Sequence, residues 1–502
     1  MKHYRRTLKS REEWRGKAVK RADKLRDQSK LVRRLRAKVD ALEKALLGAI
    51  AAAKEANARL LMPSDPCPPS SLGDRGRIRI FAVLLFLVAF VSFSAIPKVM
   101  QIIGALQIGD VCWIPSCASP INWVYRFGLW RLSLTTRINE RWLLLIDASI
   151  DLGAKKLLVA LRVRLSALSA RGGAITREDC EVIGLAVAAK WNGELVAEAL
   201  KKIMKKVGIP DFVLKDGGGD LGKAMKLLKA SDEYRKILCL ADIGHVVANA
   251  LKAKYKESEG LMAFLKAIKR GATKLRQSDL AFLAPPKIRT KGRFQSISRV
   301  GAWGIKVLEF IQGSGAYAKG SMGDRVRKML PQFGKLRTFL EGFASMCVLT
   351  DQFMKLFKTK GFNQASYREG KQMLAALDDR CPVKTRLLKW LEDTLNKHCR
   401  AAIKQVALLV STDALEGLFG TIKAIIARAP KGEFNANVLL VPALCGKLSV
   451  EDIEAALAGT SHIDLSKWIV ENIPTTLAKE RRKILGLRKK NPKPGQALSP
   501  SG

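Results

Sequence analysis

A chain of 502 residues, 48% of them hydrophobic, is long enough for about two to four domains and too apolar for disorder throughout. Lys and Arg number 89 against 45 Asp and Glu, a formal net charge of +44, which favours a polyanionic partner and nucleic acid first. The nine cysteines form no Cys-x-x-Cys pair and the chain has four histidines, which argues against a zinc site or a histidine-based metal site. Reduced thiols in a cytosolic protein are expected.

The first 61 residues form a basic segment in which apolar side chains recur at helical spacing: Leu31, Leu35, Val39, Leu42 and Leu46. We predict a basic helical arm, with a short coiled coil or DNA contact as its role and a solvated, frayed arm as the alternative. Residues 62–76, rich in Pro, Ser and Gly, read as a linker.

Residues 80–97 (IFAVLLFLVAFVSFSAIP) hold no charge and reach the lower limit of a membrane-spanning length. Two serines, the terminal proline and the neighbouring pattern favour a buried helix pair, and no membrane partner is expected. The wider segment 77–138 is predicted to be helical and to include a possible DNA-binding helix-turn-helix. In it, Ser119 would cap a helix that turns Ile121, Val124 and Tyr125 inward and Arg126 outward.

Residues 139–256 alternate between apolar runs and amphipathic stretches, the pattern of a mixed α/β sheet that begins with a hairpin. Residues 257–405 show almost only helical periodicity and are predicted to be an all-α insertion, with a basic loop at 285–294 (PPKIRTKGRF) that could touch phosphates. A core helix follows within 406–430. Residues 431–502 are predicted to form a C-terminal helical region and a basic tail.

Three acids end apolar runs: Asp147 after WLLLI, Asp216 after FVLK and Asp242 after ILCLA. Ligand-binding residues collect at the carboxyl ends of parallel strands, so we expect these acids at one edge of the sheet. For each acid alone, an ordinary turn or helix cap is the competing interpretation. Three in succession favour a site.

A fourth acid, Glu416, lies in STDALEGLFGTIKAIIAR. Asp413 could cap this helix in a capping box with Glu416, which is the structural alternative for Glu416. The predicted buried stripe leaves Glu416, Gly420 and Lys423 on another face. These three residues form a plausible surface for the DNA backbone: Glu416 would bind a metal, Gly420 would allow close approach, and Lys423 would bind a phosphate.

His245, Asn249 and Lys252 form a similar polar stripe on the helix after Asp242. A histidine beside a capping Asp is also a common local structure, so His245 is either catalytic or structural. We expect the stripe to point towards the same rim as Asp147 and Asp216.

Clustered carboxylates repel one another unless cations neutralise them, and Mg²⁺ accepts few carboxylates and substrate phosphate oxygens. Two such ions about 3.5–4 Å apart activate an attacking oxygen and stabilise a leaving oxygen. This chemistry needs no cysteine and few histidines, as the composition requires.

Four motifs together resemble one family. They are LLLIDASIDLGAKKLLV with Asp147, KDGGGDLGKAM with Asp216, Asp242-Ile-Gly-His245 before VVANALK, and STDALEGLFGTIK with Glu416. They are similar to DDE-type transposases of bacterial insertion sequences, nearest the ISNCY-like group, whose catalytic core is RNase H-like and often carries a helical insertion before the final Glu. The resemblance spans roughly residues 80 to 470.

The resemblance implies an α/β fold with an RNase H-like core, and a metal-binding triad of Asp147, Asp216 and Glu416 that takes Mg²⁺ or Mn²⁺. It implies that Asp242 and His245 lie near the DNA as an auxiliary pair. The implied reaction is DNA strand cleavage and transfer at transposon ends by a homo-oligomer in the cytoplasm, at the nucleoid. Gly417 stands where a Ser is expected, and Asp151 and Asp220 are alternative acids at the first two positions.

Two other functions stay open. One is an inactive or domesticated DNA-binding protein that kept the fold, and the other is a different RNase H-like nuclease. Both predict DNA binding, and they differ from a transposase in whether strands are cleaved and joined.

Overall fold

The computed structural model describes residues 74–485 apart from 107–110, 112, 153–154, 289–291, 314–316, 404, 429–433, 474–479 and 482–483. The predicted basic arm, almost all of the linker and the end of the tail lie outside the described residues. The chain divides into two units, one formed by 1–78 with 98–114 and the other by 79–97 with 115–502. The second unit holds the sheet and every predicted site residue.

The apolar stretch 80–97 is divided between two helices, α2 (Asp74–Leu87) and α3 (Ile96–Ala105), with a break between them. Its side chains Ala82, Val83, Phe86 and Ile96 are buried, in line with the predicted buried helix pair. No helix in the described part of the chain is long and apolar enough to cross a membrane.

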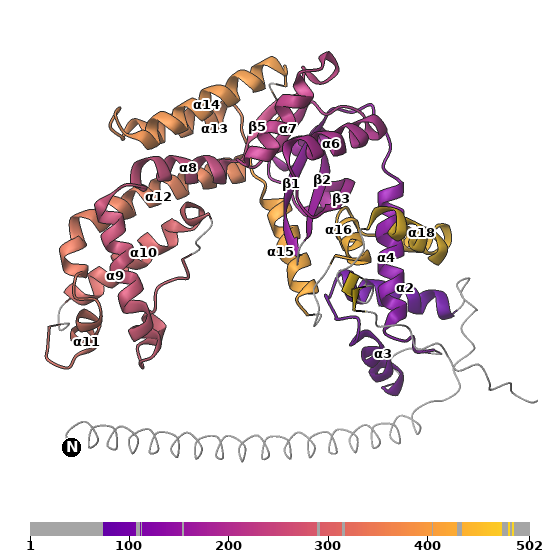
Figure 1. Cartoon of the computed structure of the whole chain (residues 1–502), viewed down its shortest axis with the longest axis horizontal. Coiled ribbons are helices and arrows are strands. Elements are labelled where there is room, and N and C mark those ends of the chain that lie inside the picture. Colours follow the sequence, from indigo (N-terminus) through magenta and orange to yellow (C-terminus); the bar gives the residue numbers. More distant parts are fainter. Residues whose placement is uncertain are drawn as a thin grey trace, which may run out of the picture. The chain divides into compact units, whose positions relative to one another are not determined.

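A five-stranded sheet forms the centre of the second unit (Figure 1), in the order β3-β2-β1-β4-β5. β1 (Trp142–Leu152), β2 (Lys155–Arg164) and β3 (Cys180–Ala188) form an antiparallel meander, with α5 (Leu165–Arg171) between β2 and β3. β4 (Phe212–Lys215) and β5 (Leu238–Ala241) run parallel to β1. Three antiparallel strands followed by two strands parallel to the first form an RNase H-like sheet, as predicted, although β3 was not foreseen.

One face of the sheet is covered by two amphipathic helices, α6 (Gly193–Val207) and α7 (Gly219–Lys229). Leu144, Ile146 and Val213 point from the strands into the hydrophobic core that these helices complete. α15 (Asp413–Ile426) contacts β1, while α4 (Ala118–Ser133) and α16 (Leu440–Ala443) contact β3. None of these three helices contributes to the α6–α7 core, which places them on the opposite face.

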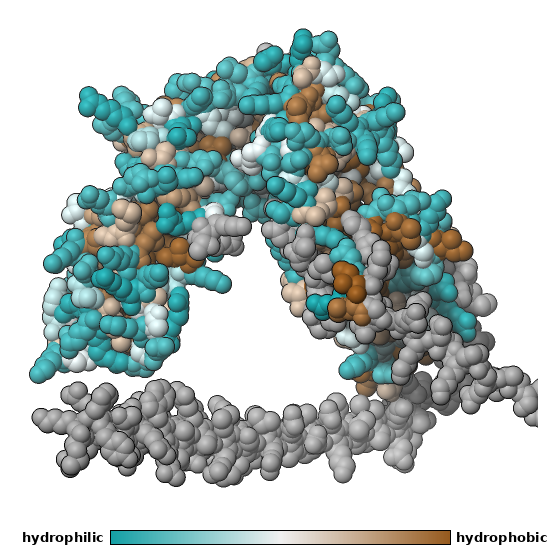
Figure 2. All heavy atoms as spheres, viewed as in Figure 1, coloured by the Kyte–Doolittle hydropathy of each residue, from teal (hydrophilic) through white to brown (hydrophobic). Residues whose placement is uncertain are grey.

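The region between β5 and α15 is helical. α8 (Ile243–Tyr255) leaves the sheet, and the insertion follows as α9 (Glu259–Arg276), α10 (Ile297–Gln312), α11 (Met322–Met329), α12 (Arg337–Lys360), α13 (Gln364–Ala375) and α14 (Pro382–Arg400). α12 and α14 pack against α8, and the rings of Tyr255, Phe264, Phe339 and Phe343 form part of the insertion's core. Hydrophilic side chains cover most of the insertion in the view of Figure 2. The predicted all-α insertion is confirmed.

The C-terminal helices α16, α17 (Val450–Gly459) and α18 (His462–Asn472) pack against α4. Two details of the predicted α4 are wrong. Its N-cap is Cys117 rather than Ser119. Arg126 turns inward and donates hydrogen bonds to the carbonyls of Leu457 and Thr460, because these carbonyls lie at the end of α17. A helix-turn-helix in this segment stays a prediction.

Candidate functional site

The strand register places three of the predicted acids level with one another. Ile146 pairs with Lys215, and Lys215 pairs with Ala241. Asp147 is the next residue of β1, and Asp216 and Asp242 directly follow β4 and β5. Adjacent strands of a sheet lie ~4.8 Å apart. The three acids are therefore level with one another: Asp216 and Asp242 follow strand ends, as expected, whereas Asp147 lies within β1.

β1 does not stop at Asp147, as the apolar run suggested, but continues to Leu152. Its pairing with β2 is irregular between Asp147 and Ile150, so Asp147 borders a bulge. Bulges re-aim side chains next to active sites. The alternative acid Asp151 pairs with Lys156 farther along the hairpin and is not level with Asp216.

The alternation of side chains decides which face carries these acids. Leu144 and Ile146 point into the core under α6 and α7. Successive side chains of a strand point to opposite faces, so Asp147 belongs to the other face. α15, which carries Glu416, contacts β1 and does not belong to the α6–α7 core. Two distant segments thus bring Asp147 and Glu416 to the same side of the sheet.

Asp216 closes a tight turn at the end of β4. Its Oδ1 accepts a hydrogen bond of 2.9 Å from the backbone N–H of Gly218. A Cβ at Gly218 would lie 2.8 Å from this oxygen, so any larger residue there would displace the Asp216 carboxylate from its hydrogen bond. Gly217 packs beside His245 and Asn249, which brings the turn against the polar stripe of α8. Asp220 is exposed in the first turn of α7, so Asp216 is the acid next to the stripe.

Asp242 is the N-cap of α8 and is only 3% exposed. Its Oδ2 accepts from the backbone N–H of His245 (2.8 Å) and lies 3.0 Å from His245 Nδ1. Its Oδ1 accepts from the backbone N–H (2.9 Å) and hydroxyl (3.1 Å) of Thr412. Burial alone would raise the pKa of Asp242, but the hydrogen bonds from His245 and Thr412 hold it below its usual value. Asp242 is therefore almost fully buried, with its carboxylate held by hydrogen bonds from His245 and Thr412.

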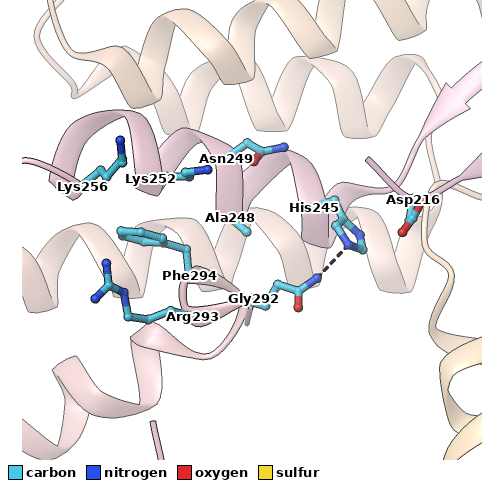
Figure 3. Close-up of a pocket in the computed structure, with 10 residues that line it drawn as sticks. Asp216, His245, Ala248, Asn249, Lys252, Lys256, Gly292, Arg293 and Phe294 are labelled. Carbon is cyan, nitrogen blue, oxygen red and sulfur yellow. Dashed lines mark hydrogen bonds between the residues drawn. The ribbon is translucent and has the colours of Figure 1, made fainter. Parts of the chain in front are cut away.

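His245 lines the same cavity as Asp216 and is bonded to Asp242. The hydrogen bond with Asp242 raises the pKa of His245, burial opposes this, and the charges of Asp242, Asp216 and Glu416 raise it further. Its Nε2 lies 2.8 Å from the side-chain amide nitrogen of Gln295 (Figure 3). The negative charges of Asp216 and Glu416 thus both contribute to the raised pKa of the His245 imidazole.

α15 carries the predicted stripes, although its first turn differs from the expectation. The N-cap is Thr412, and no capping box forms through Asp413, whose carboxylate instead pairs with Lys358 Nζ at 2.7 Å. The buried residues are those predicted: Leu415, Leu418, Phe419, Ile422 and Ile426. Glu416, Gly420 and Lys423 are exposed on another face, and a Cβ at Gly420 would meet open space.

Glu416 lies in a negative environment. Although the residue as a whole is exposed, protein atoms around its carboxylate reduce solvation and raise the pKa, and repulsion from Asp242 and Asp413 adds to this, against His245 and Lys358. A group of this kind gains from a cation beside it.

Two neighbouring cavities meet at α8. The first, of about 800 Å³, is lined on one side by Asp216, His245, Asn249 and Lys252, and on the other by the 3-10 turn η4 (Arg293–Gln295), as Figure 3 shows. The second, of about 290 Å³, contains Asp242, Asp351, Lys358, Asp413 and Glu416 among its lining residues. Ala248, Phe294 and Gln295 line both cavities. The structure thus gathers Asp216 with the whole α8 stripe, and places Glu416 in the adjoining cavity.

The residues of η4 were not predicted as parts of the site. Residues 285–294 were singled out as a basic loop, and that signal pointed to Arg293 and Phe294 without giving their location. Gln295 carries no sequence signal, since its contact with His245 spans 50 positions.

The donor set fits a hard divalent cation in its chemistry, because Asp147, Asp216 and Glu416 supply carboxylate oxygens. Among the residues that the structure describes, no group of three or more His, Cys, Asp or Glu side chains is close enough to hold a metal ion. The three acids share one region of the molecule without forming a closed cluster in this conformation.

No protein-family model matches the chain, and no curated relative is found by sequence comparison. A comparison of folds finds the Drosophila P element transposase strand transfer complex, with 10% identity and a TM-score of 0.40 over 78% of this chain and 93% of that chain. The RNase H-like assignment rests on the strand order and register rather than on this similarity.

Proposed function

We propose that the chain is a DDE-type transposase that cleaves DNA strands and joins the new ends to target DNA. The observation that carries the proposal is the register that aligns Asp147 with Asp216, the residue after β4, together with the contact of the Glu416 helix with β1. The resemblance of the motifs around these three acids supports it, and the net charge of +44 suits a DNA substrate.

Asp147, Asp216 and Glu416 would hold Mg²⁺, and Mn²⁺ would substitute for it. When bound, such ions activate the attacking oxygen and stabilise the leaving oxygen of a phosphodiester. Glu416 must approach Asp147 and Asp216 to complete the set. Burial and the charges of Asp242 and Asp413 raise the pKa of Glu416, and a bound cation would favour its charged form.

The remaining polar residues act on the DNA. Asn249 and Lys252 extend from His245 along the exposed face of α8, beside Asp216. Lys423 lies two turns after Glu416 on α15, with the open backbone of Gly420 between them. Lys252 and Lys423 would bind phosphates on either side of the acids, and Asp242 would position His245. Two transposon ends must meet, so we infer a homo-oligomer on double-stranded DNA at the nucleoid.

The test uses Asp216→Asn and Glu416→Gln with a labelled duplex that carries the DNA flanking the gene. We expect each change to abolish Mg²⁺-dependent cleavage and joining while duplex binding in EDTA stays near that of the unchanged protein. Asp220→Asn is the matched control, because Asp220 is an exposed acid of the same segment outside the cavity. Retained cleavage by either site variant would remove that acid from the catalytic set.

One alternative has an observation in its favour. The unclosed arrangement of the acids suits a DNA-binding protein that has lost catalysis. Such a protein binds the same duplex but cleaves none of it with Mg²⁺ or Mn²⁺, and the cleavage assay with the unchanged protein separates the two functions directly.

A further inference from the structure

The cavity between α8 and η4 is lined by several residues that have no part in the proposed catalytic set. Phe294 turns its ring from η4 towards α8, where Lys252 and Lys256 project from successive turns (Figure 3). The guanidinium of Arg293 lies 5.4 Å from the centre of the Phe294 ring. Asn249 contributes a side-chain amide to the wall nearer Asp216. An aromatic face, an amide and three cations therefore share one cavity.

This combination matches the chemistry of one nucleotide. Bases stack on aromatic rings whatever their identity, while Lys and Arg side chains bind the phosphates that flank them. An Asn amide both donates and accepts, so it can pair with the edge of a base. A cavity of about 800 Å³ is within the range of small-ligand pockets.

The surroundings of Phe294 favour binding of an unpaired base over a base within a duplex. Phe294 is among the lining residues of both the Asp216 cavity and the Glu416 cavity, so open space lies on more than one side of this residue. A base within a duplex is stacked on its neighbours, so its face is not available to the half-buried Phe294 ring. An unpaired base has its face free for that contact.

We propose that this cavity binds an unpaired nucleotide of a DNA strand, with the base on Phe294 and its phosphates on Lys252, Lys256 and Arg293. The placement of that nucleotide next to the scissile phosphate rests on the function proposed for Asp216. Binding itself needs neither metal nor cleavage, so the two can fail separately.

The experiment measures fluorescence anisotropy in EDTA with a labelled single-stranded oligonucleotide and with the duplex of the same sequence. Phe294→Leu keeps an apolar side chain of similar size without the ring, and Phe294→Tyr keeps the ring. We expect Phe294→Leu to weaken single-strand binding roughly 5- to 150-fold, the range of one lost base stack, and to leave duplex binding within about twofold. Phe294→Tyr should bind both DNAs like the unchanged protein.

Phe282→Ala is the matched control, because Phe282 is an aromatic residue of the same insertion that is 69% exposed and lies outside the cavity. Equal single-strand affinity of Phe294→Leu and the unchanged protein would overturn the proposal, as would an equal loss with Phe282→Ala. A free mononucleotide offers the same base and phosphate, and displacement of the oligonucleotide by it at equal concentration would overturn the assignment to a DNA strand. If Phe294→Leu loses single-strand binding while Asp216→Asn still cleaves DNA, this proposal stands and the catalytic proposal is rejected.

Discussion

Asp242 and Thr412 are joined by two hydrogen bonds, because one oxygen of the buried carboxylate accepts from both the backbone N–H (2.9 Å) and the hydroxyl (3.1 Å) of Thr412. The other oxygen holds His245 at the start of α8. One carboxylate therefore fixes the first turns of two helices that are 170 positions apart. The helix that begins at Thr412 carries Glu416 one turn later.

Removing the hydroxyl of Thr412 tests this connection. We expect Thr412→Val to lower the free energy of unfolding by about 1–2 kcal/mol, since a buried charged acceptor loses one of its donors. Urea denaturation measures the change, and Thr412→Ser, which keeps the hydroxyl, should stay close to the unchanged protein. Equal stability of the Val and unchanged proteins would show that the hydroxyl bond contributes nothing.

The protonation of His245 gives a second prediction. Its pKa should lie above the usual value of about 6.5, and Asp242→Asn should lower it, because the hydrogen bond and the negative charge weaken while burial remains. NMR titration of the imidazole protons measures both proteins. A pKa in Asp242→Asn that equals the unchanged value would contradict the assignment of Asp242 as the main cause.

The same pair makes stability depend on pH with a definite sign. The raised pKa of His245 contributes stability fully below about pH 6.5, and this is lost as the pH rises through the folded-state value. The lowered pKa of Asp242 contributes stability above about pH 3.9, and this is lost as the pH falls through its folded-state value. The stability difference between the unchanged protein and Asp242→Asn should therefore be largest between these limits.

Substitutions at two neighbouring glycines distinguish the effect of the Asp216 turn on cleavage from an effect on the stability of α7. Gly218→Ala would bring a Cβ within 2.8 Å of Asp216 Oδ1 and force that carboxylate to rotate away from the Gly218 N–H. Gly219 begins α7, and a Cβ added there would meet nothing within 4 Å, so Gly219→Ala should be neutral or slightly stabilising. We expect Gly218→Ala to lose Mg²⁺-dependent cleavage at least tenfold more than Gly219→Ala, with unfolding midpoints compared by circular dichroism. Equal cleavage by the two variants would show that the turn does not position Asp216.

The exposed face of α15 predicts a DNA contact. Lys423→Ala should weaken duplex binding and reduce the slope of log affinity against log salt by about 1, the effect of one lost phosphate contact. Gly420→Glu should weaken binding as well, because it adds a like charge where a phosphate would approach. Gly420→Ala is the matched control, since its Cβ meets open space. An unchanged salt slope in Lys423→Ala would place the DNA elsewhere.

Much of the fold could be predicted because its signals are local. The runs before Asp147, Asp216 and Asp242 gave β1, β4 and β5, and the helical spacing on α15 separated Glu416 from the buried stripe. β3 was missed because CEVIGLAVA mixes buried and half-buried positions without alternating polarity. The end of β1 was misjudged because a strand that continues past a bulge shows no apolar run there.

The contacts within the candidate site could be predicted less well, since they depend on tertiary packing. Arg126 was expected to face solvent, but the carbonyls that it binds lie more than 330 positions away. Asp242 looked like Asp147 and Asp216 in sequence, and only the approach of Thr412 made it a buried support. The loop that brings Gln295 to His245 belongs to the insertion, whose position no local pattern gives.

The packing of α4 against α17 and α18 has a consequence for synthesis of the protein on the ribosome. Arg126 and its partner Thr460 are 334 positions apart, so at about 5–20 residues per second α4 waits roughly 15–70 seconds for that partner. During that time the apolar side of α4, with Trp123 and Phe127, lacks the helices that cover it in the finished fold. The nascent chain is therefore a natural client for a chaperone that shields apolar surface until translation ends.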